Sequence, residues 1–89
     1  MVTAYDIVLE EKVEKILLKM KKKDMQTYLR VIKSILKVAK NPEIGKPLKN
    51  VLKGYRRIHV GHFVLIYRVE RKEKKIIVLK FSHHDDAYK

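Results

Sequence analysis

The fold is decided by the stretch Tyr55-Arg56-Arg57-Ile58-His59-Val60-Gly61-His62-Phe63-Val64-Leu65-Ile66-Tyr67. In its first half, Arg57 and His59 alternate with aliphatic side chains, which is the period of two of a half-buried β-strand over residues 55–60. Gly61-His62 is a candidate tight turn, and residues 63–69 are strongly apolar, as a second strand would be. We therefore expect a β-hairpin here.

Two more strands are expected, one near each end of the chain. Residues 3–9 alternate Tyr5, Ile7 and Leu9 with a mixed opposite face, which predicts a first strand. Residues 75–81 follow a polar turn and are apolar on consecutive positions, which favours a central strand covered on both faces.

Two helices are expected between the first strand and the hairpin. Residues 10–22 place one apolar set at the spacing of a single helix face, and the set is Val13, Ile16, Leu17 and Met20. Asp24 is a plausible N-cap for a second helix that runs to about Lys40 and ends at Asn41-Pro42, because the residue before proline is pushed out of helical geometry. The expected buried face of this second helix is Tyr28, Ile32, Ile35, Leu36 and Ala39.

The order of elements is therefore β-α-α-β-β-β, in the α+β class. The expected architecture is a small antiparallel sheet packed against an N-terminal helical hairpin on one face. We expect residues 1–89 to form a single domain, because a chain of 89 residues holds one modest core.

The charge is strongly basic and concentrated in the middle of the chain. Lys and Arg number 22 against 10 acidic side chains, a formal net charge of +12, and residues 25–69 alone contribute +9. Such an excess favours nucleic acid, an acidic protein or an anionic membrane surface as partner, although a merely solvated surface would also account for it. On the second helix the cations form one stripe, at Arg30, Lys33, Lys37 and Lys40.

Several classes of protein are disfavoured. With no cysteine there is no disulfide or thiolate metal site, which fits a reducing cytoplasm. The apolar runs are far shorter than the roughly 20 residues that a membrane span needs. The early acidic residues Asp6, Glu10 and Glu11 are unlike a secretory signal, so we expect a soluble, cytoplasmic protein without a membrane partner.

The open face of the sheet is the first candidate site. If aliphatic neighbours face the helices, Arg57 and His59 project together on the opposite face, about 7 Å apart. Three lysines, Lys46, Lys49 and Lys53, project from the irregular loop over residues 42–54 beside them. The same two side chains could instead simply solvate the exposed face of a half-buried strand.

The C-terminal run His83-His84-Asp85-Asp86 is the second candidate. Adjacent residues of an extended segment point apart and match no ligand spacing, so we expect no metal and no cofactor. Imidazoles suit proton transfer near neutral pH. Tyr88 could be a buried anchor or a hydroxyl presented to a ligand. The sequence lacks a Gly-rich phosphate cradle, a nucleophile motif and paired acidic residues, which argues against a metal-dependent nuclease or a glycosidase.

Four segments together carry a family resemblance. They are Asn41-Pro42, Gly45-Lys46-Pro47-Leu48, residues 52–67 and Ser82-His83-His84-Asp85-Asp86-Ala87-Tyr88. In order and spacing, over nearly the whole chain, this pattern resembles the RelE/ParE superfamily of toxin-antitoxin toxins, and most of all archaeal RelE. The resemblance implies a toxin of a type II toxin-antitoxin system that enters the ribosomal A site and cuts mRNA there. It also implies an acidic, helical cognate antitoxin that holds the toxin inactive.

The resemblance also implies site residues. The family's alternating basic residues fall on Arg57 and His59, its pair before the last tyrosine falls on His83-His84, and the tyrosine falls on Tyr88. Val64 and His84 stand where the family pattern has arginines. The missing cationic charge would come from Arg56, Arg68 or the loop over residues 42–54, which we call the lysine loop.

The chemistry implied is metal-independent attack of an RNA 2′-OH on the neighbouring phosphate. We expect Arg57 and the three loop lysines to hold phosphates, and His59, His83, His84 and Tyr88 to share proton transfer and base stacking, with His84 as the first choice of acid. Two alternatives stay open. One is a ParE-like inhibitor of DNA gyrase that acts by binding, and the other is a noncatalytic RNA-binding or ribosome-associated domain.

Overall fold

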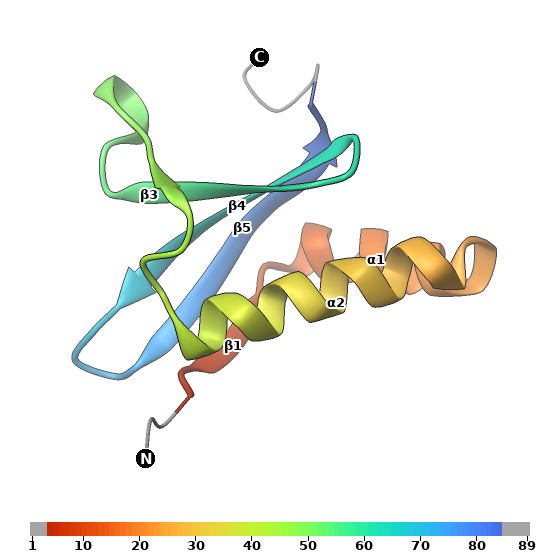
Figure 1. Ribbon diagram of the computed structural model, residues 1–89, viewed down its shortest axis with the longest axis horizontal. Helices are drawn as coiled ribbons and strands as arrows, with labels where there is room; N and C mark the ends of the chain where they lie inside the picture. Colours follow the sequence, from red (N-terminus) through yellow and green to blue (C-terminus); the bar gives the residue numbers. More distant parts are fainter. Residues whose placement is uncertain (1–3, 85–89) are drawn as a thin grey trace.

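The computed structural model describes residues 4–84, in which two helices cover one face of a five-stranded β-sheet (Figure 1). Along the chain the elements are β1 (Asp6–Leu9), α1 (Glu11–Lys23), α2 (Met25–Lys40), β2 (Lys46–Pro47), a 3₁₀ turn (Asn50–Leu52), β3 (Tyr55–Val60), β4 (Phe63–Glu70) and β5 (Lys75–His83). The strands lie side by side in the order β1-β5-β4-β3-β2. The α+β class and the helical hairpin before the β3-β4-β5 strands are confirmed.

The sheet differs from the expected antiparallel one at both edges, by a parallel strand at one edge and by an additional short strand at the other. β2, β3, β4 and β5 pair antiparallel, but β1 pairs parallel with β5, so that Ile7 lies opposite Ile76. A parallel pair requires a long connection, and the helices and strands between β1 and β5 supply it. At the other edge, the expected irregular loop contains β2, in which Lys46 lies opposite Arg57.

The two helices form where the sequence places them. Asp24 caps α2 as expected, because its carboxylate accepts hydrogen bonds from the Thr27 hydroxyl at 2.6 Å and from the Thr27 backbone N–H at 3.1 Å. These hydrogen bonds, that of the hydroxyl first, lower the pKa of the Asp24 carboxyl. A carboxylate at a helix N-terminus also complements the helix dipole.

The packed faces of the helices are rotated from the expected ones. Val13 and Leu17 of α1 are buried, but Ile16 is 40% exposed. On α2, Leu36 is 53% exposed, whereas Val31 and Val38 are buried and had been missed. The sequence of α2 contains two overlapping apolar stripes that share Ile35 and Ala39, and the sheet covers the one that includes the valines. Ile16 and Leu36 were therefore wrongly assigned to the core.

One buried tyrosine positions the lysine loop. The Tyr67 side chain is fully buried, and its hydroxyl donates to the Pro42 carbonyl at 2.8 Å and accepts from the Gly45 N–H at 2.9 Å. A Cβ on Gly45 would lie 2.5 Å from the Tyr67 hydroxyl oxygen and 2.8 Å from the Arg57 carbonyl oxygen, so only glycine fits this close approach. The loop is thereby held against β3, with Lys46 beside Arg57.

Candidate active site

A bulge in β5 decides which side chains face the site. Ile66 pairs with Lys80 but the next residue, Tyr67, pairs with Val78, so Leu79 is an extra residue on β5. A bulge of this kind reverses the alternation of side chains along the strand. Before it, Val78 packs in the core beneath the helices. After the bulge, Phe81 packs in the same core and is only 1% exposed.

The face away from the helices is built as short rows across β3, β4 and β5. Residues paired across an antiparallel ladder project on the same face. Three such rows follow from the strand registers: Tyr55-Arg68-Ile77, Arg57-Ile66-Lys80 and His59-Val64-Ser82. Successive rows lie about 7 Å apart. We call this surface the open face. Its three rows carry three cations, one imidazole and the hydroxyls of Tyr55 and Ser82, and no carboxylate, whereas the next row along β4 carries Glu70, opposite Lys75.

The floor of the open face is apolar and covered. Val64 is 0% and Ile66 is 4% exposed, and Leu48 and Tyr55 pack against them. Val64, which stands where the family pattern has an arginine, is thus part of a small second core, and a cation could not occupy its place without losing this packing.

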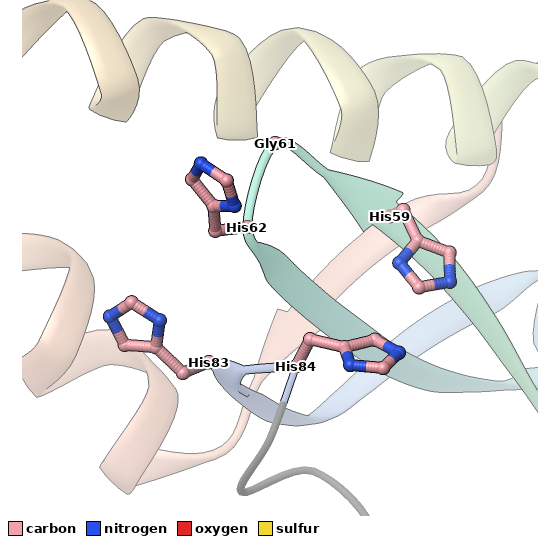
Figure 2. A pocket seen from close by; sticks show the side chains of 5 residues that line it. All are labelled: His59, Gly61, His62, His83 and His84. Atoms are coloured by element: carbon pink, nitrogen blue, oxygen red, sulfur yellow. The ribbon is translucent and has the colours of Figure 1, made fainter.

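The four histidines of the chain all lie at one end of the sheet. His59, His62, His83 and His84, with Gly61, line a surface cavity of about 440 Å³ (Figure 2). The rings of His59 and His84 stack with their centroids 5.4 Å apart. The backbone N–H of His84 donates to the His62 carbonyl at 2.9 Å, which holds the end of β5 beside the β3-β4 turn.

The two C-terminal histidines separate. His83 projects to the other side of β5, where its ring lies 4.6 Å from that of Phe63. Figure 2 shows His62 and His83 on one side of the turn and the His59-His84 pair on the other. Only His84 therefore joins His59 on the open face. Tyr88, together with Asp85 and Asp86, lies outside the described residues.

The cations expected to bind RNA are divided between the two faces. Arg57 and Arg68 lie in adjacent rows of the open face, and Lys46 lies beside Arg57 on β2. Lys49 and Lys53 are exposed on either side of the 3₁₀ turn.

Arg56 lies apart from this group. It pairs with Tyr67, and its guanidinium donates to the carbonyl oxygens of Gly45 at 2.7 Å and Glu43 at 3.3 Å. It helps to hold the loop, on the side of the sheet away from the open face.

Sequence reasoning missed Lys80 and Ser82. Lys80 was hidden within the apolar run over residues 75–81, which predicts a strand covered on both faces, and Ser82 was assigned to the C-terminal segment that follows it. The bulge that turns both to the open face has no signature in that run. The one available signal was a lysine between Leu79 and Phe81, because cations are rarely buried in central strands.

Two features are absent from the part of the chain that the structure describes. Within residues 4–84, no three His, Asp or Glu side chains gather as they would around a metal ion. No helix in this part of the chain is long and apolar enough to cross a membrane. The open face combines cations with a pair of imidazoles whose row lies about 7 Å from the row of Arg57, an arrangement suited to binding a phosphodiester and moving protons at it.

Comparison with known proteins gives a consistent result. Residues 7–88 match the family model described as the ParE toxin of the type II toxin-antitoxin system, parDE. A Methanocaldococcus jannaschii protein named as toxin RelE4 is 33% identical over 86 residues, which cover 96% of this chain and 92% of that protein.

Solved structures show the same fold. The RelBE2 toxin-antitoxin complex of Mycobacterium tuberculosis contains a chain with a TM-score of 0.79 at 20% identity, covering 97% of this chain and 98% of that one. The archaeal RelE–RelB complex of Pyrococcus horikoshii gives a TM-score of 0.70 at 24% identity, covering 96% and 100%. At these identities the two structures establish a shared fold and no more.

Proposed function

The chain belongs to the RelE/ParE superfamily of type II toxin-antitoxin toxins, and on that premise we propose that it is a ribosome-dependent mRNA endonuclease that cuts in the A site. The observation that carries the proposal is the stacked His59-His84 pair, which stands one row from Arg57, in a part of the open face whose rows carry no carboxylate. A toxin that acts by binding alone needs no pair of proton-transferring groups.

The reaction needs no reagent beyond RNA itself. The 2′-oxygen forms a bond to phosphorus while the bond from phosphorus to the 5′-oxygen breaks, which leaves a 2′,3′-cyclic phosphate and a 5′-hydroxyl. One protein group takes the proton of the 2′-OH and another gives a proton to the leaving 5′-oxygen. Cations stabilise the additional negative charge on the phosphate as it passes through the transition state.

The geometry supports an assignment of these roles. His59 and His84 are close enough to flank one phosphate, so one can act as base while the other acts as acid, and we assign the acid to His84. Arg57, with Lys46 beside it, binds the phosphate. His83 packs against Phe63 on the other side of β5, so we assign it no proton transfer. Tyr88 remains a proposed stacking or hydroxyl group.

We also propose an acidic, helical antitoxin as partner. The solved relatives from M. tuberculosis and P. horikoshii are toxin-antitoxin complexes. On this chain, the apolar side chains of α2 that the core leaves outside are Met25, Leu29 and Leu36, each about half exposed. They lie beside the cationic stripe that begins at Arg30. Both features fit an amphipathic helix with acidic edges.

The test is cleavage of mRNA on ribosomes with an open A site. The wild-type chain should produce 2′,3′-cyclic phosphate ends, and His84→Ala and His59→Ala should each lower the rate by about 100-fold or more. The matched control is His62→Ala, because this side chain points away from the stacked pair. Substrate with a 2′-deoxy sugar at the cleaved position should stay intact. Wild-type rates in both site variants would refute the assigned mechanism.

A ParE-like inhibitor of DNA gyrase is the second candidate, and one observation favours it. The buried Val64 leaves this face without a cation that the RNA-cleaving pattern includes. A gyrase supercoiling assay run beside the cleavage assay separates the two functions. Salt-sensitive binding to ribosomes without any cleavage would instead identify a noncatalytic RNA-binding domain.

A further inference from the structure

We propose that Lys80 is a substrate-binding residue which, together with Arg57, holds a phosphate of the RNA backbone, and that the bulge at Leu79 places it there. The proposal rests on the proposed function and adds a residue to the same site. It concerns a lysine from β5, whereas the other phosphate-binding groups come from β3 and the loop before it.

The strand registers bring the two cations into one row. Ile66 on β4 pairs with Arg57 on one side and with Lys80 on the other. With neighbouring strands about 4.8 Å apart, the Cα atoms of the two cations are about 10 Å apart across Ile66. Because Ile66 is buried at 4% exposure, the long side chains of Arg57 and Lys80 stand on either side of an apolar floor. A phosphate above the side chains that cover this floor is within reach of both.

The bulge is what turns Lys80 toward this row. In a regular strand, Lys80 would follow Ile76 and Val78, both fully buried beneath the helices, and its ammonium would be directed into the core. Burial of an unpaired ammonium is strongly unfavourable. The extra residue at Leu79 brings Phe81 into the core and Lys80 onto the open face. The bulge thus keeps the Lys80 ammonium out of the core and adds a cation to the open face.

Ser82 is a second, independent indication of a ligand at this place. It is two residues beyond Lys80 on the same face, in the row of His59 and Val64. Its hydroxyl oxygen is buried and has no hydrogen-bond partner within residues 4–84. Buried hydroxyls are almost always hydrogen-bonded, so a rotation of the Ser82 side chain that turns its hydroxyl outward breaks no hydrogen bond within residues 4–84 and lets it bond to a ligand. A phosphate or ribose oxygen held by Lys80 would accept from the hydroxyl in that rotamer.

The chemistry of the row favours a phosphate over a carboxylate. A guanidinium offers a planar fork that matches two phosphate oxygens, and an ammonium adds a compact point charge opposite it. The imidazole pair lies within one to two rows of both cations. Cleavage of a phosphodiester needs proton-transferring groups at this distance from the bound phosphate, whereas binding of a carboxylate does not need them.

The binding test uses a single-stranded oligoribonucleotide whose 2′-oxygens are methylated, so that it cannot be cleaved, and fluorescence anisotropy over a range of salt. Lys80→Met removes the charge but keeps most of the aliphatic stem, so it preserves packing. We expect about five- to twentyfold weaker binding and a salt slope reduced by about 0.7, the change for one lost contact to a single strand. Lys80→Arg should restore most of the affinity. The control is Lys75→Ala at the far end of β5, where the ammonium lies 3.5 Å from Glu73.

Ser82→Ala tests the hydroxyl in the same assay, where a severalfold loss of affinity is expected. Circular dichroism melting of each variant shows whether the fold is kept. If Lys80→Met and Ser82→Ala both bind like the wild-type chain, the proposal is wrong. If Lys80→Met instead loses affinity for a polyglutamate peptide and keeps its affinity for RNA, the row binds an acidic protein and the phosphate assignment is wrong.

Cleavage on programmed ribosomes separates this proposal from the proposed function. A wild-type chain that cleaves, with Lys80→Met equally active, overturns the role of Lys80 and leaves the endonuclease standing. A wild-type chain that never cleaves, but binds RNA in a Lys80-dependent way, overturns the endonuclease and supports the phosphate site. A raised KM in Lys80→Met at a nearly unchanged kcat would indicate ground-state binding of the phosphate.

Discussion

Replacement of Tyr67 by phenylalanine tests how the loop is attached to the sheet. The change removes one oxygen that both donates to the Pro42 carbonyl and accepts from the buried Gly45 N–H. A buried polar group left without a partner costs about 1–3 kcal/mol, and two groups lose theirs here, so we expect about 2–4 kcal/mol of lost stability. A domain of this size has a total stability of only about 5–15 kcal/mol.

Urea denaturation followed by circular dichroism measures this loss. The midpoint should fall while the slope stays unchanged, because the surface exposed on unfolding is the same. Tyr28→Phe is the matched control, since the Tyr28 hydroxyl makes no hydrogen bond within residues 4–84 and its loss should cost less than about 0.5 kcal/mol. If Tyr67→Phe costs no more than this control, the two hydrogen bonds do not hold the loop and our account of the loop is refuted.

Three further predictions concern the same framework. Gly45→Ala should cost about 1–3 kcal/mol in urea denaturation, because the added Cβ meets the Tyr67 hydroxyl and the Arg57 carbonyl; an unchanged midpoint would contradict this. In thermal melts Val31→Ala should lower the free energy of unfolding by about 2 kcal/mol because Val31 is fully buried, and Leu36→Ala should lower it by less than about 0.5 kcal/mol. The reverse order would show that the side of α2 with Leu36 is the packed one. Burial raises the pKa of the Tyr67 phenol, because the charged form is disfavoured in the folded chain. The stability that the neutral phenol contributes is therefore complete below the unfolded-state pKa of about 10 and is lost as the pH rises through the folded-state pKa. The wild-type chain should therefore lose stability above that pH more steeply than Tyr67→Phe, and parallel alkaline melting curves would argue against it.

The local pattern of the sequence is enough to predict the elements themselves. The alternation in residues 55–60, the Gly61-His62 turn and the apolar run after it correspond to β3 and β4 almost residue for residue. Asp24 and Asn41-Pro42 delimit α2 as expected, because caps and prolines act on the backbone within a few residues. The same alternation places Arg57 and His59 on the face away from the helices.

The positions of the helix faces were less predictable. α2 offers two apolar stripes of similar width, and only contact with the sheet selects Val31 and Val38 over Leu36. A periodic pattern shows that a helix has an apolar side, but the angle at which that side meets its neighbour depends on the packing of both. The exposed leucines that result are the ones we propose for the antitoxin.

The sequence by itself determined that this chain is a small, strongly basic α+β protein of the RelE/ParE type with histidines near its C-terminus. Only the tertiary structure decided which of those groups meet. His84 stacks on His59 while His83 turns away, and Lys80 and Ser82 join the open face. The physical reason is the single extra residue at Leu79, because a bulge changes the direction of every later side chain on its strand. The bulge depends on the pairing of β5 with β4 and on the packing of Phe81 in the core, and both involve residues that are distant in the sequence.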